Sequence, residues 1–395
     1  MGYRGSKSSL FKYNSQPVRK VKGVKEQRVD GSWDVIRINK TPIQLGQAGR
    51  LGTNNFKLLL SLRCTLMGFE RSYQVKIPAN QLMTRNFSLV SGLNPWFITG
   101  FSDAEGSFIV SVYRSESSKL KWRVTAYFSI HLHNKDIAIL KSIKQTLGVG
   151  NVRKNSDTTS LFRVDNIQEL QIIINHFDKY QLIGAKLSDY ILFKQCFELI
   201  KGKEHLTQEG LEKIISLKYK LNKGLSEELI KAFPNIIPVD RPHYSFNGIQ
   251  NPHWIAGFAS GDSSFYVSTE SIKSIKQNKT INTRVRLNFG TNLHIRDKQL
   301  LIAIANYLTI LPKNINIYEG KNKQNALLQI RSFSQIISKI IPFFNEYPII
   351  GIKSLDFFEF KVIAEMMKNK EHLTESGLNK IMNIVKNMNL RREDF

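Results

Sequence analysis

The sequence predicts an α+β protein made of two pseudo-twofold-related repeats, each with the element order αββαββα. Two observations support this prediction. Long blocks of the chain occur twice in the same order, and each copy contains a stretch that alternates polar and apolar residues with the period of a β-strand. At 395 residues the chain is long enough for two domains of ordinary size and an N-terminal extension.

The chain is strongly basic, with 57 Lys and Arg against 32 Asp and Glu and a formal net charge of +25. This balance indicates a polyanionic partner, either nucleic acid or an acidic membrane surface. A hydrophobic content of 42% excludes a disordered basic tail, because that many apolar residues can build a core. No apolar run approaches the length of a membrane span, so no membrane partner is expected.

Two cysteines, Cys64 and Cys196, are too few for a disulfide framework or a cysteine zinc site. They indicate a reducing compartment. Residues 1–25 contain several basic side chains and no acid, a composition that resembles a transit peptide.

The first helix of each copy carries a glycine at a matched position. "NPWFITGFSDAEGSFIVS" begins at Asn94 and "NPHWIAGFASGDSSFYVS" begins at Asn251, which aligns Gly100 with Gly257. A glycine inside a helix costs roughly 0.5–1 kcal/mol relative to alanine, so a packing reason is expected. The two nearly bare faces are therefore predicted to meet at a helix interface on the pseudo-twofold axis.

Strands follow the first helix in each copy. From Trp122 the segment "WRVTAYFSIHL" alternates between apolar and polar residues, and a second alternating stretch surrounds Leu287 in the other copy. One face of each predicted sheet should pack on helices. The opposite face is long, polar and basic.

Later helices are repeated as well. "FDKYQLIGAKLSDYILFK" from Phe177 matches "FNEYPIIGIKSLDFFEFK" from Phe344, and "KEHLTQEGLEKI" from Lys203 matches "KEHLTESGLNKI" from Lys370. Chance does not account for such identities, because they recur in order across whole modules. The predicted organisation is an N-terminal extension of leader or exon-derived origin with no assigned role (1–92), a first repeat (93–232), a stiff Pro-rich linker (233–250) and a second repeat (251–395).

Each first helix ends in an acid, Glu105 in one copy and Asp262 in the other. The C-terminal end of a helix is the negative pole of its dipole, where an acid is unfavourable unless a cation binds. Two acids beside two such ends, brought together by the glycine faces, form a candidate site for hard divalent cations. Mg²⁺ is the preferred ion, and two or more ions would be shared between the two acids. Surface acids just past helix ends are the alternative interpretation, which duplication at matched positions disfavours.

The segments "ITGFSDAEG" from Ile98 and "IAGFASGDS" from Ile255 resemble the paired motifs of the LAGLIDADG homing endonucleases. The closest resemblance is to the single-chain, double-motif type encoded in fungal mitochondrial introns, and it runs from about Leu93 to near the C-terminus. It implies a saddle of two antiparallel sheets that binds DNA, with the motif helices paired at the interface. It also implies that the last acid of each motif, Glu105 and Asp262, binds metal.

The expected function is therefore site-specific hydrolysis of both strands of DNA during intron homing. The resemblance implies a monomer that acts on double-stranded DNA with a long recognition site, and a mitochondrial location. A β-ribbon fits the B-DNA major groove, where polar side chains can bond base edges. The candidate DNA contacts are Arg123, Tyr127, Ser129, His131, Arg284, Arg286, Asn288 and Asn292.

The family also places a basic residue near each metal site, which implies catalytic roles for Lys186 and Lys353 in stabilising phosphate charge. Two departures distinguish the second motif. Ser260 replaces Asp103, so the earlier acid is not implied to be catalytic. Ser263 replaces Gly106, and the sequence alone does not fix the backbone conformation beside the second acid.

Two alternatives remain at this stage. The protein could be an RNA maturase that assists the splicing of its own intron, with intron RNA as partner, or a catalytically decayed DNA-binding homologue. Intact acids in both motifs favour the nuclease. Other nuclease types lack support, since the sequence has neither a P-loop nor a cysteine zinc cluster.

Overall fold

The computed structural model describes residues 25–27, 33–35, 60–66, 69–75, 92–243, 246–273, 280–310, 316–319 and 324–389. Contacts between residues divide the chain into a unit at Met1–Phe87 and a second at Ser88–Phe395. In the first unit β1 (Lys25–Gln27) pairs antiparallel with β2 (Trp33–Val35), and β3 (Leu60–Leu66) with β4 (Phe69–Val75). The prediction of a leader or exon-derived origin for residues 1–92 falls largely outside the described residues.

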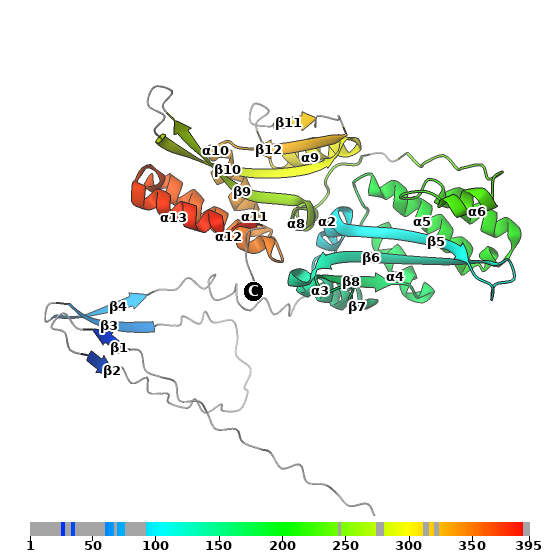
Figure 1. Cartoon of the computed structure of the whole chain (residues 1–395), viewed down its shortest axis with the longest axis horizontal. Coiled ribbons are helices and arrows are strands. Elements are labelled where there is room, and N and C mark those ends of the chain that lie inside the picture. The colour runs from blue at the N-terminus through cyan, green and yellow to red at the C-terminus, as the bar shows by residue number, and fades with distance from the viewer. Residues whose placement is uncertain are drawn as a thin grey trace, which may run out of the picture. The chain divides into compact units, whose positions relative to one another are not determined.

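The first repeat has the predicted order of a helix, a hairpin, a helix, a second hairpin and further helices (Figure 1). Its sheet is antiparallel throughout, with the strand order β5-β6-β8-β7. The elements are α2 (Pro95–Glu105), β5 (Gly106–Arg114), β6 (Trp122–His133), η1 (Asn134–Asp136), α3 (Ile137–Leu147), β7 (Asn151–Lys154), β8 (Thr159–Val164), α4 (Ile167–Lys179), α5 (Lys186–Lys201), η2 (Glu204–Leu206), α6 (Gln208–Lys218) and α7 (Glu227–Ala232).

The second repeat has the same architecture, and its sheet has the corresponding order β9-β10-β12-β11. The predicted α+β fold with two related antiparallel sheets is thus confirmed. The elements are α8 (Pro252–Asp262), β9 (Ser263–Lys273), β10 (Thr280–His294), η3 (Ile295–Asp297), α9 (Lys298–Tyr307), β11 (Asn316–Glu319), β12 (Asn325–Ile330), α10 (Phe333–Gln335), the π-helix η5 (Ile336–Ile340), α11 (Ile341–Glu346), α12 (Lys353–Lys368), η6 (Glu371–Leu373) and α13 (Glu375–Lys386).

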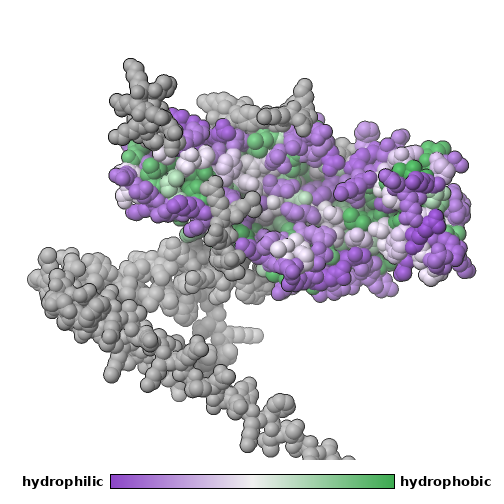
Figure 2. All heavy atoms as spheres, in the orientation of Figure 1, coloured by the Kyte–Doolittle hydropathy of each residue, from purple (hydrophilic) through white to green (hydrophobic). Residues whose placement is uncertain are grey.

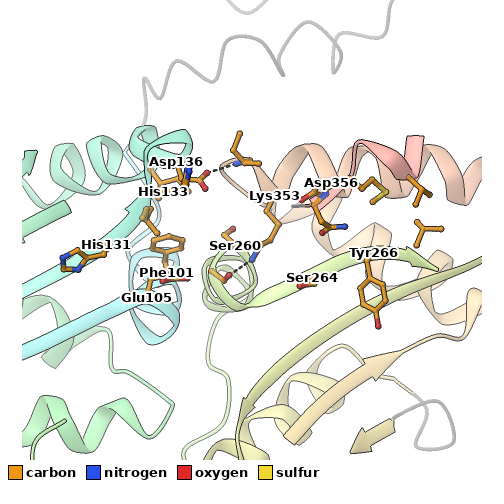
Figure 3. A pocket seen from close by; sticks show the side chains of 18 residues that line it. Phe101, Glu105, His131, His133, Asp136, Ser260, Ser264, Tyr266, Lys353 and Asp356 are labelled. Atoms are coloured by element: carbon orange, nitrogen blue, oxygen red, sulfur yellow. Dashed lines mark hydrogen bonds between the residues drawn. The ribbon is translucent and has the colours of Figure 1, made fainter. Parts of the chain in front are cut away.

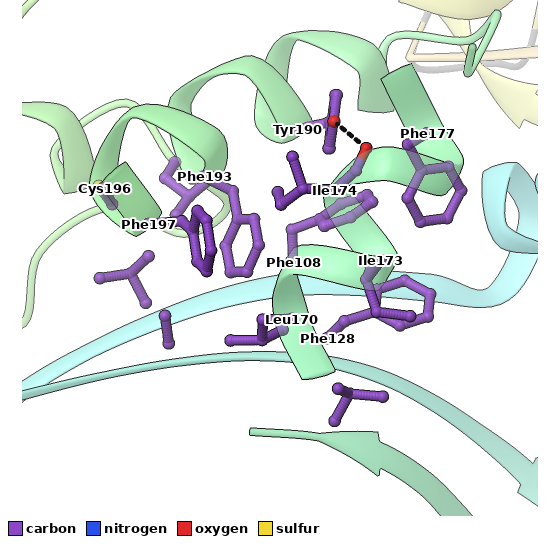
Figure 4. Close-up of a cluster of buried hydrophobic side chains, with 14 of the residues drawn as sticks. Phe108, Phe128, Leu170, Ile173, Ile174, Phe177, Tyr190, Phe193, Cys196 and Phe197 are labelled. Carbon is purple, nitrogen blue, oxygen red and sulfur yellow. Dashed lines mark hydrogen bonds between the residues drawn. The ribbon is translucent and has the colours of Figure 1, made fainter. Parts of the chain in front are cut away.

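Each repeat has its own aromatic core between its sheet and its helices. In the first, the Phe108 ring on β5 lies 5.1 Å from that of Phe128 on β6 and 5.3 Å from that of Phe177 on α4 (Figure 4). The matched residue of the second repeat, Phe265, is equally buried, and its ring centre lies 5.2 Å from that of Phe289. Each sheet therefore has one face fixed by a core, which leaves the other free for a ligand.

The two motif helices, α2 and α8, pack directly on each other with no side chain between them at the two predicted glycines. A methyl group at Gly100 would overlap the backbone carbonyl of Trp254, and one at Gly257 would overlap that of Phe97. The glycine prediction is correct, because only glycine permits this distance between two helix backbones.

Each motif helix passes straight into the first strand of its sheet. Gly106 ends α2 with φ −73° and ψ 150°, and Ser263 ends α8 with φ −97° and ψ 160°. Both are extended conformations that any residue can adopt. The replacement of glycine by Ser263 therefore leaves the backbone path intact, and its hydroxyl bonds that of Thr291 at 2.7 Å.

The visible face of the second unit is mainly hydrophilic, with apolar residues in scattered places (Figure 2). Among the described residues, no helix combines the length and hydrophobicity needed to cross a membrane.

Burial of His176 gives the fold a testable dependence on pH. The ring Nε2 lies 3.1 Å from Thr99 Oγ1 on α2, and desolvation lowers the pKa of this imidazole from 6.5 to about 4. Between these values the unfolded chain takes up a proton that the folded chain does not. The contribution of His176 to stability should therefore fall as pH drops through this window, by up to about 3 kcal/mol.

Asp103, whose pKa is raised to about 6, acts with the opposite sign, so His176 is isolated by comparison with a variant. In urea unfolding at pH 4, 5, 6 and 7, the free energy of unfolding of the wild type should drop relative to that of His176→Gln as the pH falls. His243, an exposed residue of the linker, provides the matched control as His243→Gln. The same pH profile in all three proteins would contradict the assignment.

Candidate functional site

The two motif acids lie where α2 and α8 end, at the boundary between the sheets. Both carboxylates are partly buried. Glu105 reaches across the helix interface, since a methyl group placed on Gly261 of α8 would lie 3.2 Å from its Cγ. A cleft of about 820 Å³, lined by residues of both repeats, opens over Glu105 and Lys353 (Figure 3). The structure thus brings the predicted metal ligands together on the pseudo-twofold axis.

The electrostatics of the two acids favour a bound cation. Desolvation raises the pKa of Glu105, and the neighbouring Asp262 raises it further. Desolvation likewise raises the pKa of Asp262, against the opposing effect of Lys186 and Lys353. Neither acid forms an ion pair within the described part of the chain, so their oxygens are available to a ligand.

The predicted lysines lie at the same place, but they are already engaged. Lys186 Nζ donates to the carbonyls of Ser102 at 3.0 Å and Ala104 at 3.1 Å. Lys353 Nζ donates to those of Ala259 at 3.2 Å and Gly261. The expectation that the helix ends stay uncompensated until a cation binds is therefore wrong. Each lysine caps the motif helix of its own repeat and offsets its dipole.

Sequence reasoning missed a role for two acids that follow the long strands. Asp136 ends η1 of the first repeat, and its Oδ1 accepts a 2.7 Å hydrogen bond from the Ile352 amide of the second. Asp297 ends η3 of the second repeat and accepts a 2.7 Å bond from the Ala185 amide of the first. The repeated sequences "LHNKD" and "LHIRD" were the available signal.

Asp103, the other acid of the first motif, is a structural residue. The residue is 8% exposed, and its carboxylate accepts bonds from the Ile183 amide and from Trp254 Nε1, both at 2.9 Å. Burial raises the pKa of Asp103 to about 6. In the second motif Ser260 occupies the matched position, and its Oγ accepts a 3.1 Å bond from the Ile350 amide.

The candidate DNA contacts of the first sheet divide into accessible and covered residues. Arg123 and His131 are exposed on β6, and Tyr127 is half-buried beneath the Arg163 guanidinium, 3.7 Å from its ring centre. Ser129 is only 1% exposed, and its Oγ has no hydrogen-bond partner among the described residues. The expectation that Ser129 lies on an open surface is wrong, because Arg163 is its neighbour across the strands.

The second sheet shows the same division. Arg284 and Asn292 are exposed on β10, whereas Arg286 forms a 3.1 Å ion pair with Glu270. Asn288 is 1% exposed, and its side-chain amide donates to Ser268 Oγ at 3.2 Å and to the Arg286 carbonyl at 3.1 Å. The expectation of an open position is wrong for Asn288 too, since its donors are used within the sheet.

The donor set at the paired helix ends fits a hard divalent cation. Two carboxylates are available, and carboxylates with water and phosphate oxygens complete such a shell. In the described part of the chain, no three His, Cys, Asp or Glu side chains converge to hold a metal by themselves. The site therefore fits an ion that binds together with a phosphate-bearing ligand.

Comparisons with known proteins agree with this geometry. The model of the LAGLIDADG endonuclease family matches residues 98–197 and 255–364, one region in each repeat. The probable intron-encoded endonuclease 3 of Neurospora crassa is 35% identical over 402 residues, which cover 96% of this chain and 68% of that protein.

Solved structures share the fold. The LAGLIDADG homing endonuclease I-SmaMI bound to cleaved DNA is 42% identical, with a TM-score of 0.72 and coverage of 76% of this chain and 99% of that chain. I-SmaMI bound to an uncleaved DNA target in the presence of calcium ions is 43% identical, with a TM-score of 0.70 and coverage of 75% and 99% respectively.

Two related sheets, joined through paired helices that each end in an acid, define a single-chain nuclease with two motifs. The chain belongs to the LAGLIDADG endonuclease family. The resemblance inferred from the sequence, including its double-motif type and its assignment as an endonuclease, is confirmed.

Proposed function

We propose that this chain cleaves both strands of a specific DNA site, with Glu105 and Asp262 as its metal ligands. The observation that carries the proposal is the placement of these two carboxylates, one from each repeat, at adjoining helix ends, with Glu105 in the wall of a cleft. Each repeat would serve one strand of the duplex, because the pseudo-twofold axis of the protein matches that of the two phosphodiesters.

Mg²⁺ is the proposed ion, and divalent metal use is supported by the calcium ions present with the related I-SmaMI. Bound there, such ions would activate water and stabilise the leaving oxygen of a phosphodiester. The protein supplies oxygen ligands at a fixed spacing, since both acids stand on helices whose backbones are in contact.

Lys186 and Lys353 are proposed to act on the phosphate. An ammonium group has three donors, and each lysine uses two of them on the carbonyls of its motif helix. The third donor remains for a phosphate oxygen or a water bound to it. Burial lowers the pKa of both lysines, while the nearby carboxylates oppose that shift and favour the charged form.

Double-stranded DNA is proposed to lie across the two sheets, contacted by the polar residues that are exposed or only half-buried. These are Arg123, Tyr127, His131, Arg284, Arg286 and Asn292. A single chain with both motifs forms the whole site, so a monomer is the proposed active species. A mitochondrial location is proposed from the basic residues 1–25 and from the intron-encoded fungal relative. Intron RNA is an alternative partner, because the same basic surface would bind it.

The proposed activity can be tested with DNA from the intron-free form of the host gene. A duplex spanning the insertion site should be cut on both strands with Mg²⁺ and left intact with EDTA. A duplex in which the two flanks of that site are exchanged serves as the matched control and should not be cut. Cleavage of both duplexes at equal rates would contradict site specificity, and no cleavage of either would contradict the activity.

A further inference from the structure

The two active-site lysines stand at the first position of their helices, α5 and α12, and neither helix is capped by its own sequence. The residues before them, Ala185 and Ile352, have no side chain that could accept a hydrogen bond. The amides of these two residues are instead bound by Asp297 and Asp136, each from the opposite repeat.

These contacts are close and specific. Gly351, in the turn before Lys353, has φ +86°, and a methyl group on it would overlap the carboxylate of Asp136. On the other side, a methyl group on Gly184 would lie 3.5 Å from Asp297 Oδ1. A carboxylate at a helix N-terminus also lies at the positive pole of the dipole, which favours it. Each acid therefore fixes where the helix of the other repeat begins.

The start of the helix decides where the lysine ammonium lies. Lys353 must reach the carbonyls of Ala259 and Gly261, and a displaced helix start would move Nζ away from them. A connected path thus runs from Asp136 in the first repeat through Lys353 to the end of α8 beside Asp262. The mirror path runs from Asp297 through Lys186 to the end of α2 beside Glu105.

We propose that Asp136 and Asp297 are positioning residues for cleavage, each setting the lysine of the opposite repeat. Asp136 governs the step served by Lys353, and Asp297 governs the step served by Lys186. This inference rests on the role proposed above for the lysines. Its distinguishing feature is the crossover: loss of an acid in one repeat reproduces loss of the lysine in the other.

The test uses the full chain and a duplex whose two strands carry different end labels. Asp136→Ala should slow cleavage of the same strand as Lys353→Met. Asp297→Ala should slow cleavage of the same strand as Lys186→Met. Each loss should be about 10–100-fold, as for other residues that orient metal ligands. Asp136→Asn keeps an oxygen acceptor for the Ile352 amide and should recover most of the rate. Glu209→Ala removes an exposed acid on α6 and should have no effect.

Double variants separate positioning from general loss of structure. Asp136→Ala with Lys353→Met should be no slower than Lys353→Met alone, whereas Asp136→Ala with Lys186→Met should combine both losses. DNA affinity, measured on every variant, should stay near wild type, and thermal melting should show that every variant is folded at the assay temperature, with a modest loss where a helix cap is removed.

The outcomes distinguish the positioning role of the two acids from the phosphate-binding role proposed for the two lysines. Wild-type cleavage by both lysine variants would overturn the lysine role, and the positioning role with it. If the lysine variants are slow, any of three results would overturn the positioning role alone. Asp136→Ala could cleave at the wild-type rate, or it could slow the strand that Lys186→Met slows. Asp136→Asn could also be as slow as Asp136→Ala.

Discussion

Glu105→Gln should abolish double-strand cleavage, and Asp262→Asn should do the same. Each change replaces a charged oxygen ligand with a neutral amide of almost the same size, which binds hard cations far less well. Residues that merely orient metal ligands cost 10–100-fold when lost, so removal of a ligand itself should cost more than about a hundredfold. The rate of linear product from a plasmid target, with Mg²⁺ in excess, provides the measurement.

Binding and folding should survive both changes. A negative charge that faces phosphates is removed, so affinity for target DNA without metal should be equal or higher. Glu209→Gln, on the exposed surface of α6, is the matched control and should cleave normally. A wild-type rate in either motif variant would show that the two acids do not share the catalytic metal site.

Gly100→Ala and Gly257→Ala should each destabilise the protein and impair cleavage together. The added methyl group would overlap a backbone carbonyl of the facing helix, which cannot rotate away as a side chain could. Overpacking of a core costs about 1–3 kcal/mol, and a rigid obstacle places these changes at the upper end of that range. The separation of α2 from α8 would also move the two acids apart.

Thermal melting and cleavage should be measured on the same preparations. A loss of about 3 kcal/mol should lower the melting temperature by several degrees. Gly202→Ala offers a matched control at the end of α5, where the nearest atoms to an added methyl group are 3.4 Å away. Melting of Gly100→Ala at the wild-type temperature would mean that the two helices can move apart without loss of stability, which would contradict the observed close packing.

The sequence was most informative where a pattern is local and repeated. The alternation in β6 and β10 follows from the period of a strand, and Gly100 and Gly257 follow from duplication of a costly residue at one place. Both features can be recognised in the sequence without knowledge of any tertiary contact. For this reason the fold class, the helix interface and the meeting of Glu105 with Asp262 could all be predicted.

Other parts of the site depend on which side chains reach across from elsewhere. Alternation identifies the polar face of a strand but not the neighbouring side chains that bury part of that face. The burial of Ser129 beside Arg163 therefore could not be foreseen. Lys186 has a long stem, and its contact with the end of α2 is set by the three-dimensional path of the turn before it. The bond from Asp136 to Ile352 joins residues of different repeats, which no local pattern reveals.

The bond between Asp103 and Trp254 determines which halves can pair. Asp103 belongs to the first repeat and receives its indole donor from the second, where the first repeat itself has Phe97, a ring without a donor. Two copies of the first repeat would leave two buried carboxylates without that donor, a loss of 1–3 kcal/mol or more for each. Two copies of the second would set each indole opposite Ser260. If the halves were expressed as separate chains, the heterodimer should outcompete both homodimers, and the linker would then supply proximity rather than the choice of partner.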